Sequence, residues 1–199
     1  MSAAYRRMES VHGYPLDEVV SALQKCIRRS QVDEALYWAM EMNMSGMAAY
    51  CFRRLMVIAN EDIGIADHFA PVLVNACFQM GKELQQKTHG TAEEKATRAW
   101  DPETLLHAVW YLAKAPKSRE LNHAMAVIEL RMERGELSPI PDVARDMHTA
   151  AGRAMGRGRG FFQREGGKLH PEADMEGNPW SRAWEKERPR WPDEDGEST

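Results

Sequence analysis

The chain of 199 residues contains only three cysteines, Cys26, Cys51 and Cys77, which lie far apart within apolar, helix-like segments. A small secreted scaffold needs an even number of closely spaced cysteines, so this usage argues against a disulfide framework. Isolated thiols of this kind behave as small buried hydrophobes. We therefore expect a cytoplasmic protein from a reducing compartment.

Long apolar runs and a large excess of one charge are also missing. No run approaches the roughly 18 apolar residues of a membrane-spanning helix, and residues 1–15 lack the apolar stretch of a signal peptide. The formal net charge is −4, so nucleic-acid binding would have to depend on local basic clusters. No segment alternates with period two for long enough to predict a strand.

The regular apolar spacing is helical and predicts an all-α, multi-helix bundle. Residues 16–27 place apolar side chains three and four positions apart on one face. Asp101, Pro102 and Glu103 combine an N-cap, an N1 proline and an early acid, which is a complete helix start. Three further starts are predicted from polar caps: Ser30 for the second helix, Ser118 for a helix ending near Gly135, and Asp142 for a helix ending at Gly156.

Composition divides the chain into three parts: an N-terminal arm (1–14), a helical domain (15–156), and a basic Gly/Arg hinge with an irregular, partly disordered acidic tail (157–199). The tail has too little aliphatic content to fold independently. Its tryptophans, Trp180, Trp184 and Trp191, nevertheless predict contact with the domain, a second subunit or a partner. Within the domain, residues 85–99 are polar and predict a loop or an exposed helical extension.

Two motifs carry a family resemblance. Residues 53–67, RRLMVIANEDIGIAD, and residues 110–118, WYLAKAPKS, resemble elements that end two helices in the C-terminal domain of the RarA/MgsA/WRNIP1 family, clamp-loader-like AAA+ ATPases of replication-fork maintenance. Residues 21–42 and 139–158 resemble neighbouring segments of the same domain. The resemblance covers roughly residues 17–162. It implies a fold like the clamp-loader-type C-terminal collar, which forms tetramers in the family.

The chain departs from the family pattern in two respects. It has no G-x-x-x-x-G-K-[ST] phosphate-binding motif and no room for an ATPase module before Asp17. Its polar segment 85–99 is also longer than the pattern predicts. The resemblance therefore implies a free-standing, non-enzymatic oligomerisation domain without a cofactor, of a kind that would suit a phage or another mobile element.

The EDIG residues of the first motif allow two interpretations. The carboxylates of Glu61 and Asp62 could form a metal or contact site, although adjacent acids on a helix point in different directions. The favoured alternative is structural: Asn60 or Asp62 caps the next helix, and Glu61 pairs with Arg53 or Arg54. The motif residues with an expected structural role are Arg53, Arg54, Asn60, Glu61, Asp62, Gly64, Pro116 and Ser118.

Basic residues form two candidate nucleic-acid contacts. Lys114 and Lys117 lie at a helix end beside Ser118, where they either stabilise the helix terminus or bind an anion such as a DNA phosphate. A second cluster combines arginine, glycine and phenylalanine, as single-strand binders do. Its alternative is a solvated loop whose arginines pair with the acidic tail or with a neighbouring subunit. The cluster comprises Arg145, Arg153, Arg157, Arg159, Phe161, Arg164 and Lys168.

No metal site or catalytic residue is predicted, because the seven histidines lack ligand spacing. The leading hypothesis is a non-enzymatic accessory protein of DNA replication or repair that forms a homo-oligomer, with a tetramer favoured by the resemblance, and binds DNA or replisome components. The alternative is a protein-interaction module that binds or mimics part of an AAA+ ATPase without contacting DNA. A hydrolase or nuclease is disfavoured because no carboxylate or His/Cys cluster has usable spacing.

Overall fold

A computed structural model describes residues 9–87, 90–91, 99–173, 179–191 and 193. Throughout these ranges the regular elements are helices, so the predicted all-α class is confirmed. None of the helices in the described ranges is long and apolar enough to cross a membrane. The chain forms two compact units, Met1–Gly135 and Glu136–Thr199. Residues 136–156, predicted to belong to the helical domain, fall within the second unit.

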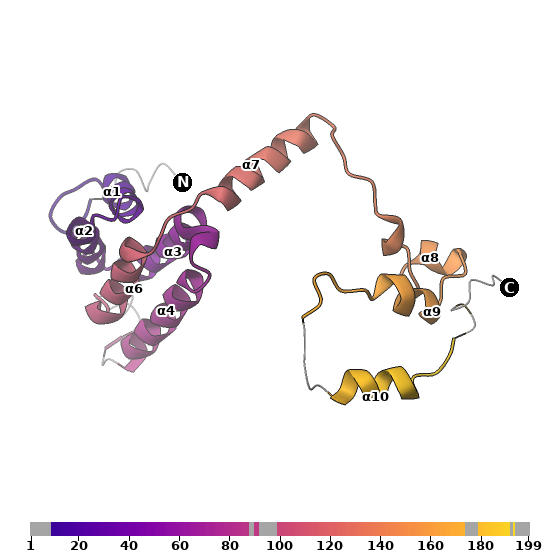
Figure 1. Ribbon diagram of the computed structural model, residues 1–199. Coiled ribbons are helices and arrows are strands. Elements are labelled where there is room, and N and C mark those ends of the chain that lie inside the picture. Colours follow the sequence, from indigo (N-terminus) through magenta and orange to yellow (C-terminus); the bar gives the residue numbers. More distant parts are fainter. Residues whose placement is uncertain (1–8, 88–89, 92–98, 174–178, 192, 194–199) are drawn as a thin grey trace. The chain divides into compact units, whose positions relative to one another are not determined.

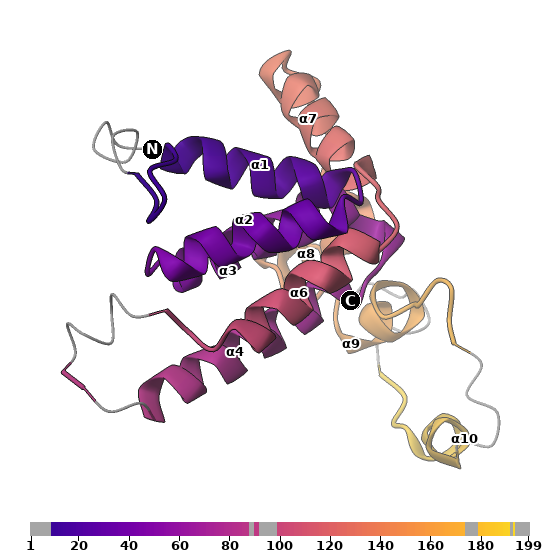
Figure 2. The same ribbon diagram turned by 90° about the vertical axis from the view of Figure 1, so that its left-hand side faces the viewer.

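The first unit is a bundle in which α1, α2, α3, α4 and α6 surround a common core (Figure 1, Figure 2). The most extensive helix pairs are α1 with α2, α2 with α6, and α4 with α6. The apolar face predicted within residues 16–27 is buried against this core. The helices are α1 (Leu16–Arg28), α2 (Val32–Met44), α3 (Ala48–Ile58), α4 (Ala70–Lys87), α6 (Pro102–Lys114) and α7 (Glu120–Glu133), with a π-helical turn η2 (Ala59–Ile63) and a 3-10 turn η3 (Gly64–Ala66) between α3 and α4.

An aromatic cluster closes one part of the core. The rings of Phe52, Phe78 and Trp100 lie with centroid separations of 5.6, 5.8 and 5.9 Å. The buried side chain of Asn43 holds Trp100 in place, because its amide donates to the Trp100 carbonyl (3.0 Å) and accepts from the Trp100 N–H (2.9 Å). This exchange determines where the chain re-enters the bundle ahead of α6.

The polar segment 85–99 lies largely outside the described residues. Its first three residues complete α4, and Gln85 is buried there. The prediction of a loop or an exposed helical extension therefore remains a prediction for residues 88–89 and 92–98.

The cysteines are free in the structure. Cys51 and Cys77 are buried in the core, whereas Cys26 is half-buried. Burial raises the pKa of the Cys51 thiol to about 12, as expected for a thiol that packs as a small hydrophobe.

One predicted helix cap, Asp101, is confirmed, and two, Ser118 and Ser30, are wrong. The Asp101 carboxylate accepts a hydrogen bond from the Glu103 N–H (3.1 Å) at the start of α6. The Ser118 hydroxyl accepts a hydrogen bond from the Glu120 N–H (3.2 Å), but the N-cap residue of α7 is Arg119, so the predicted Ser118 cap is wrong by one residue. Ser30 does not cap α2, because its φ of +57° places it in a left-handed conformation that ends α1, whereas an N-cap needs an extended backbone.

The second unit contains short helical segments in place of the single helix predicted from Asp142 to Gly156. The Asp146 side chain accepts from the His148 N–H (2.9 Å), and this local bond competes with helix formation. A new helix then starts, with Thr149 as its cap. The elements are η4 (Asp142–Ala144), α8 (Ala150–Ala154), α9 (Arg159–Phe161), η5 (Phe162–Gly166) and α10 (Pro179–Glu187).

Candidate functional site

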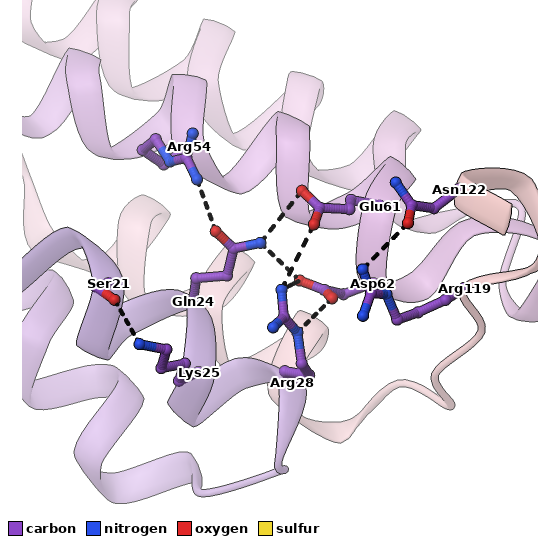
Figure 3. A network of polar contacts seen from close by, with 9 residues as sticks. All are labelled: Ser21, Gln24, Lys25, Arg28, Arg54, Glu61, Asp62, Arg119 and Asn122. Atoms are coloured by element: carbon purple, nitrogen blue, oxygen red, sulfur yellow. Dashed lines mark hydrogen bonds and ion pairs between the residues drawn. The ribbon is translucent and has the colours of Figure 1, made fainter. Parts of the chain in front are cut away.

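The EDIG motif places a buried carboxylate between two helices of the first unit. The Asp62 side chain is fully buried in the π-helical turn η2 and accepts hydrogen bonds from Arg28 (2.6 and 3.3 Å) and Gln24 (3.0 Å), both on α1 (Figure 3). The hydrogen bond to Asp62 also raises the pKa of the Arg28 guanidinium. Since each donor comes from α1, Asp62 ties that helix to the end of α3.

Glu61 and Arg54 extend the same network without meeting each other. A Glu61 oxygen lies 3.6 Å from an Arg28 nitrogen, and the Gln24 amide donates to the other Glu61 oxygen (3.3 Å). Arg54 donates to Gln24 Oε1 (2.6 Å). The predicted pairing of Glu61 with Arg53 or Arg54 is therefore wrong, because the acid turns towards α1 at the π-helical turn.

The predicted capping role of Asn60 or Asp62 is also wrong. The Asn60 amide donates to the Met56 carbonyl (2.8 Å) and so satisfies the end of α3. The turn before α4 is instead held by Asp67, whose carboxylate accepts from the Phe69 N–H (2.9 Å). The signal for Asp67 was present in the sequence, since an aspartate side chain often accepts a hydrogen bond from the backbone two residues on and so forms a turn.

The APKS motif contacts the EDIG motif directly. The Ser118 N–H donates to the Asp62 carbonyl (2.9 Å). Lys117 donates to the carbonyls of Ala113 (3.1 Å) and Ala115 (2.5 Å) and to the Ser30 hydroxyl (3.3 Å). Burial lowers the pKa of Lys117. These three acceptors match the three N–H groups of Lys117, which favours the helix-terminus interpretation over anion binding.

Gly64 allows the two motifs to approach each other. Its φ of +53° and ψ of −131° are unfavourable for residues with a side chain, and a Cβ atom here would lie 3.2 Å from the Ser118 carbonyl oxygen. The absence of a side chain therefore serves both the local turn and the contact with the APKS segment.

Replacement of Gly64 by alanine is expected to lower the free energy of unfolding by about 1–3 kcal/mol, because strain in the turn adds to crowding against Ser118. Urea unfolding followed by circular dichroism measures the loss. Gly135→Ala is a matched control, since Gly135 also has a positive φ (+76°) but open space around its missing Cβ. Equal losses in the two variants would show that the contact with Ser118 contributes nothing.

The helix α7 is apolar but uncovered. All 14 of its residues are described and none is buried. It projects from the bundle in both ribbon views (Figure 1, Figure 2). One row of side chains, 49% to 60% exposed, steps by four, three and four residues, the spacing of a coiled-coil seam. This row, called the α7 stripe below, consists of Leu121, Met125, Ile128 and Met132.

An apolar groove continues the α7 stripe onto the bundle. It has a volume of about 560 Å³ and lies between the end of α3, η2 and the first turns of α7. Leu121 and Met125 belong to both features. The other lining residues are Met56, Val57, Asn60, Glu61 and Asn122.

The second unit contains all seven residues of the predicted Arg/Gly/Phe cluster. Two of them, Arg157 and Phe161, are engaged in contacts within the unit. Arg157 donates to the Asp142 carboxylate (2.6 Å), to the Asp142 carbonyl (2.9 Å) and to the Arg145 carbonyl (3.0 Å). The first of these bonds lowers the pKa of Asp142. The Arg157 guanidinium also covers the Phe161 ring at 4.3 Å, so this ring is not open for stacking on a base.

Four cationic side chains of the cluster are exposed, namely Arg153, Arg159, Arg164 and Lys168. Arg153 donates to the Met147 carbonyl (3.1 Å), and Lys168 pairs with Glu165 (3.0 Å). Arg159 and Arg164 instead contact the tail, as the alternative interpretation of the cluster expects: Arg159 lies 5.6 Å from the Trp191 ring centre and Arg164 donates to the Asp193 carbonyl (3.3 Å).

Sequence reasoning missed three residues that the structure makes central: Gln24, Arg28 and Asp193. Each pairs with a group more than 30 residues away, so local spacing carried no signal for it. The predicted Lys114 and Lys117 belong to the first unit, whereas the seven residues of the Arg/Gly/Phe cluster belong to the second. Among the described residues, no group of three His, Cys, Asp or Glu side chains is arranged to hold a metal ion.

A helical bundle whose EDIG turn is hydrogen-bonded to its APKS turn defines a C-terminal helical domain of the AAA+ ATPase class. The family model described as "MgsA AAA+ ATPase C terminal" matches residues 29–168. The chain belongs to this family.

Three relatives place the match within longer proteins. The chain is 33% identical over 145 residues to an uncharacterised AAA domain-containing protein of Mycobacterium tuberculosis, covering 72% of this chain and 29% of the relative. It is 32% identical to ATPase WRNIP1 of Dictyostelium discoideum (72% and 15%) and 31% identical to Replication-associated recombination protein A of Bacillus subtilis (71% and 31%). The chain thus spans less than a third of the length of these relatives.

Proposed function

We propose that this chain is a non-enzymatic accessory domain of DNA replication or repair, which assembles through α7 and contacts DNA through the exposed basic residues of its second unit. The name of the Bacillus subtilis relative, Replication-associated recombination protein A, supports the biological role. The observation that carries the proposal is the uncovered α7 stripe.

The α7 stripe fits a second copy of the same helix. An isolated helix of about this length is marginal in water, and helices are ordinarily stabilised by packing one face. The stripe alternates steps of four and three residues, which is the pattern that keeps two helices in contact along a seam. Two positions that flank the stripe, Glu129 and Arg131, carry opposite charges, which can pair across such a seam.

A second apolar pair supports the proposal of an oligomer larger than a dimer. Val127 and Leu130 are also about half exposed, and at 100° per residue they lie on the side of α7 opposite the stripe. A helix that is apolar on two sides can contact two neighbours. An oligomer of higher order would cover both sides at once.

The basic residues favour contact with a phosphate backbone. Arg153, Arg159, Arg164 and Lys168 are exposed within one short, glycine-rich segment, and such a segment can follow the spacing of successive phosphates. In an oligomer the segment would be repeated, so weak individual contacts would combine through a high effective concentration.

The proposed contact with DNA predicts a salt-sensitive affinity for DNA that depends on Arg153 and Lys168. We choose these two because they bond to residues close by in the sequence, Met147 and Glu165, whereas Arg157 holds the unit together. The double variant Arg153→Ala/Lys168→Ala is expected to bind a labelled oligonucleotide about tenfold more weakly, with a salt slope smaller by about 1 to 2. Fluorescence anisotropy at increasing salt measures both quantities.

The control for this experiment is Arg182→Ala/Lys186→Ala, which removes two exposed charges from α10. It is expected to bind like the unaltered chain. Equal losses of DNA affinity in both double variants would show that the effect depends only on net charge. Absence of salt-sensitive binding by the unaltered chain would refute the proposed contact with DNA.

One observation favours a second candidate function. Arg157 and Phe161, which looked best suited to DNA, are engaged within the protein, while the apolar groove beside α7 is open. A protein-interaction module that binds an AAA+ ATPase without contacting DNA would use this groove. Recovery of an ATPase from lysate after nuclease treatment, lost on Met125→Lys/Ile128→Lys, would favour this candidate.

A further inference from the structure

Three backbone amides of the glycine-rich segment Gly158–Phe161, which comprises the N-cap and the three residues of α9 and is called the Gly158 loop below, converge on one carboxylate. The N–H groups of Gly158 (2.7 Å), Gly160 (2.9 Å) and Phe161 (2.9 Å) all donate to the side chain of Asp193, more than 30 residues further along the chain. Burial by itself would raise the pKa of Asp193, but these hydrogen bonds lower it below its ordinary value. The loop therefore stabilises a negative charge.

The close approach of this carboxylate depends on Gly158. A Cβ atom at position 158 would lie 2.9 Å from one Asp193 oxygen and 3.0 Å from the other. The backbone itself would accept a side chain, because the φ of Gly158 is −99°. The missing side chain thus leaves room for an anion, as in other loops whose successive amides form a nest.

The tail places an aromatic ring, as well as the Asp193 carboxylate, against this loop. Trp191, two residues before Asp193, lies 5.6 Å from the guanidinium of Arg159 and 6.3 Å from the ring of Trp184. Arg164 also donates to the Asp193 carbonyl (3.3 Å). The Trp191 ring beside Arg159 resembles a stacked base, and the Asp193 carboxylate held by the backbone amides resembles a phosphate. Together they resemble the two groups of a nucleotide.

We propose that the loop Gly158–Phe161 binds a phosphate of single-stranded nucleic acid, and that Trp191 and Asp193 of the tail occupy this site in competition with it. The proposal rests on the proposed DNA-binding function and adds its regulation. Carboxylates and phosphates present the same kind of oxygen acceptor to backbone N–H groups. Trp191 and Asp193, called the latch below, lie beyond residues 29–168, the range that matches the family. The latch is therefore not part of the matched domain.

The test compares affinities for a labelled single-stranded oligonucleotide. Asp193→Asn keeps the size of the side chain but removes its charge, so it is expected to bind about tenfold more tightly, as when a binding-competent state becomes more populated. Glu187→Gln removes one charge from the same tail at an exposed position and is expected to stay within about twofold of the unaltered chain. The double variant Gly158→Ala/Asp193→Asn is expected to lose the gain, since the new methyl group occupies the site.

Inorganic phosphate tests the anion site at Gly158–Phe161 independently of DNA binding. In Asp193→Asn, added phosphate is expected to shift the amide NMR signals of Gly158, Gly160 and Phe161, and in the unaltered chain much less. If the variants bind DNA but Asp193→Asn binds no better than Glu187→Gln, or if phosphate shifts none of these signals, the proposal is overturned. If phosphate shifts them only in Asp193→Asn while no variant binds DNA, the latch and its anion site stand and the proposed DNA-binding function fails.

Discussion

Replacement of Met125 and Ile128 by lysine is expected to convert an oligomer of this chain into a monomer. Both residues lie in the α7 stripe and contribute nothing to the buried core of the first unit, so the fold should persist. Burial of each Met or Ile side chain stabilises an interface by about 1.5–3 kcal/mol. Losing both, and placing two cations in the seam, should therefore weaken association at least about a hundredfold.

The measurement is solution mass by light scattering at micromolar concentration, with circular dichroism to verify helix content. Ala124→Lys/Ala126→Lys is the matched control: it adds the same charge to the same exposed helix, on the two sides between the apolar rows. It should keep the mass of the unaltered chain. A monomeric unaltered chain, or equal dissociation of both variants, would contradict assembly through the stripe.

Loss of Arg28 is expected to destabilise the first unit by about 3–5 kcal/mol, because it leaves the buried Asp62 carboxylate without its charged partner. Asp62 has no exposed side-chain surface, and the Gln24 amide is its remaining side-chain donor among the described residues. Arg28→Lys should cost less, since it keeps the charge but not the paired donors. Urea unfolding of Arg28→Ala and Arg28→Lys measures the difference.

Two further variants isolate the buried charge as the cause. Lys25→Ala removes an exposed cation of α1 that donates to the Ser21 hydroxyl (2.8 Å) and takes no part in the Asp62 network (Figure 3). It should change the free energy of unfolding by less than about 0.5 kcal/mol. The double variant Arg28→Ala/Asp62→Asn should recover part of the loss, because the amide carries no charge to compensate. No greater loss for Arg28→Ala than for Lys25→Ala would rule out the network as a source of stability.

The same network extends to the start of α7, the helix through which the chain is proposed to assemble. Asp62 accepts from α1 through its side chain and from Ser118 through its carbonyl, immediately before α7 begins. The base of α7 is therefore anchored where the EDIG and APKS turns meet. In the proposed assembly through the α7 stripe, this anchor would reduce the entropy that α7 loses on joining an oligomer.

Local patterns predicted much of the fold. Helical periodicity identified α1 and its buried face, and the Asp101 cap identified the start of α6, because both depend on residues within one or two turns. The same local reasoning failed at Ser30 and over the residues after Asp142, where a left-handed residue and an aspartate turn replaced the expected caps. In each case a competing backbone conformation, invisible in the apolar spacing, was more stable.

The sequence by itself determined the all-α class, the family motifs and the concentration of arginine and glycine in one segment. The tertiary structure decided which groups meet: Asp62 with Arg28, the Gly158 loop with Asp193, and Ser118 with Asp62. It also decided that the α7 stripe is uncovered. Periodicity reveals that a helix face is apolar, but whether another surface covers that face depends on contacts distant in sequence, which only the folded chain brings together.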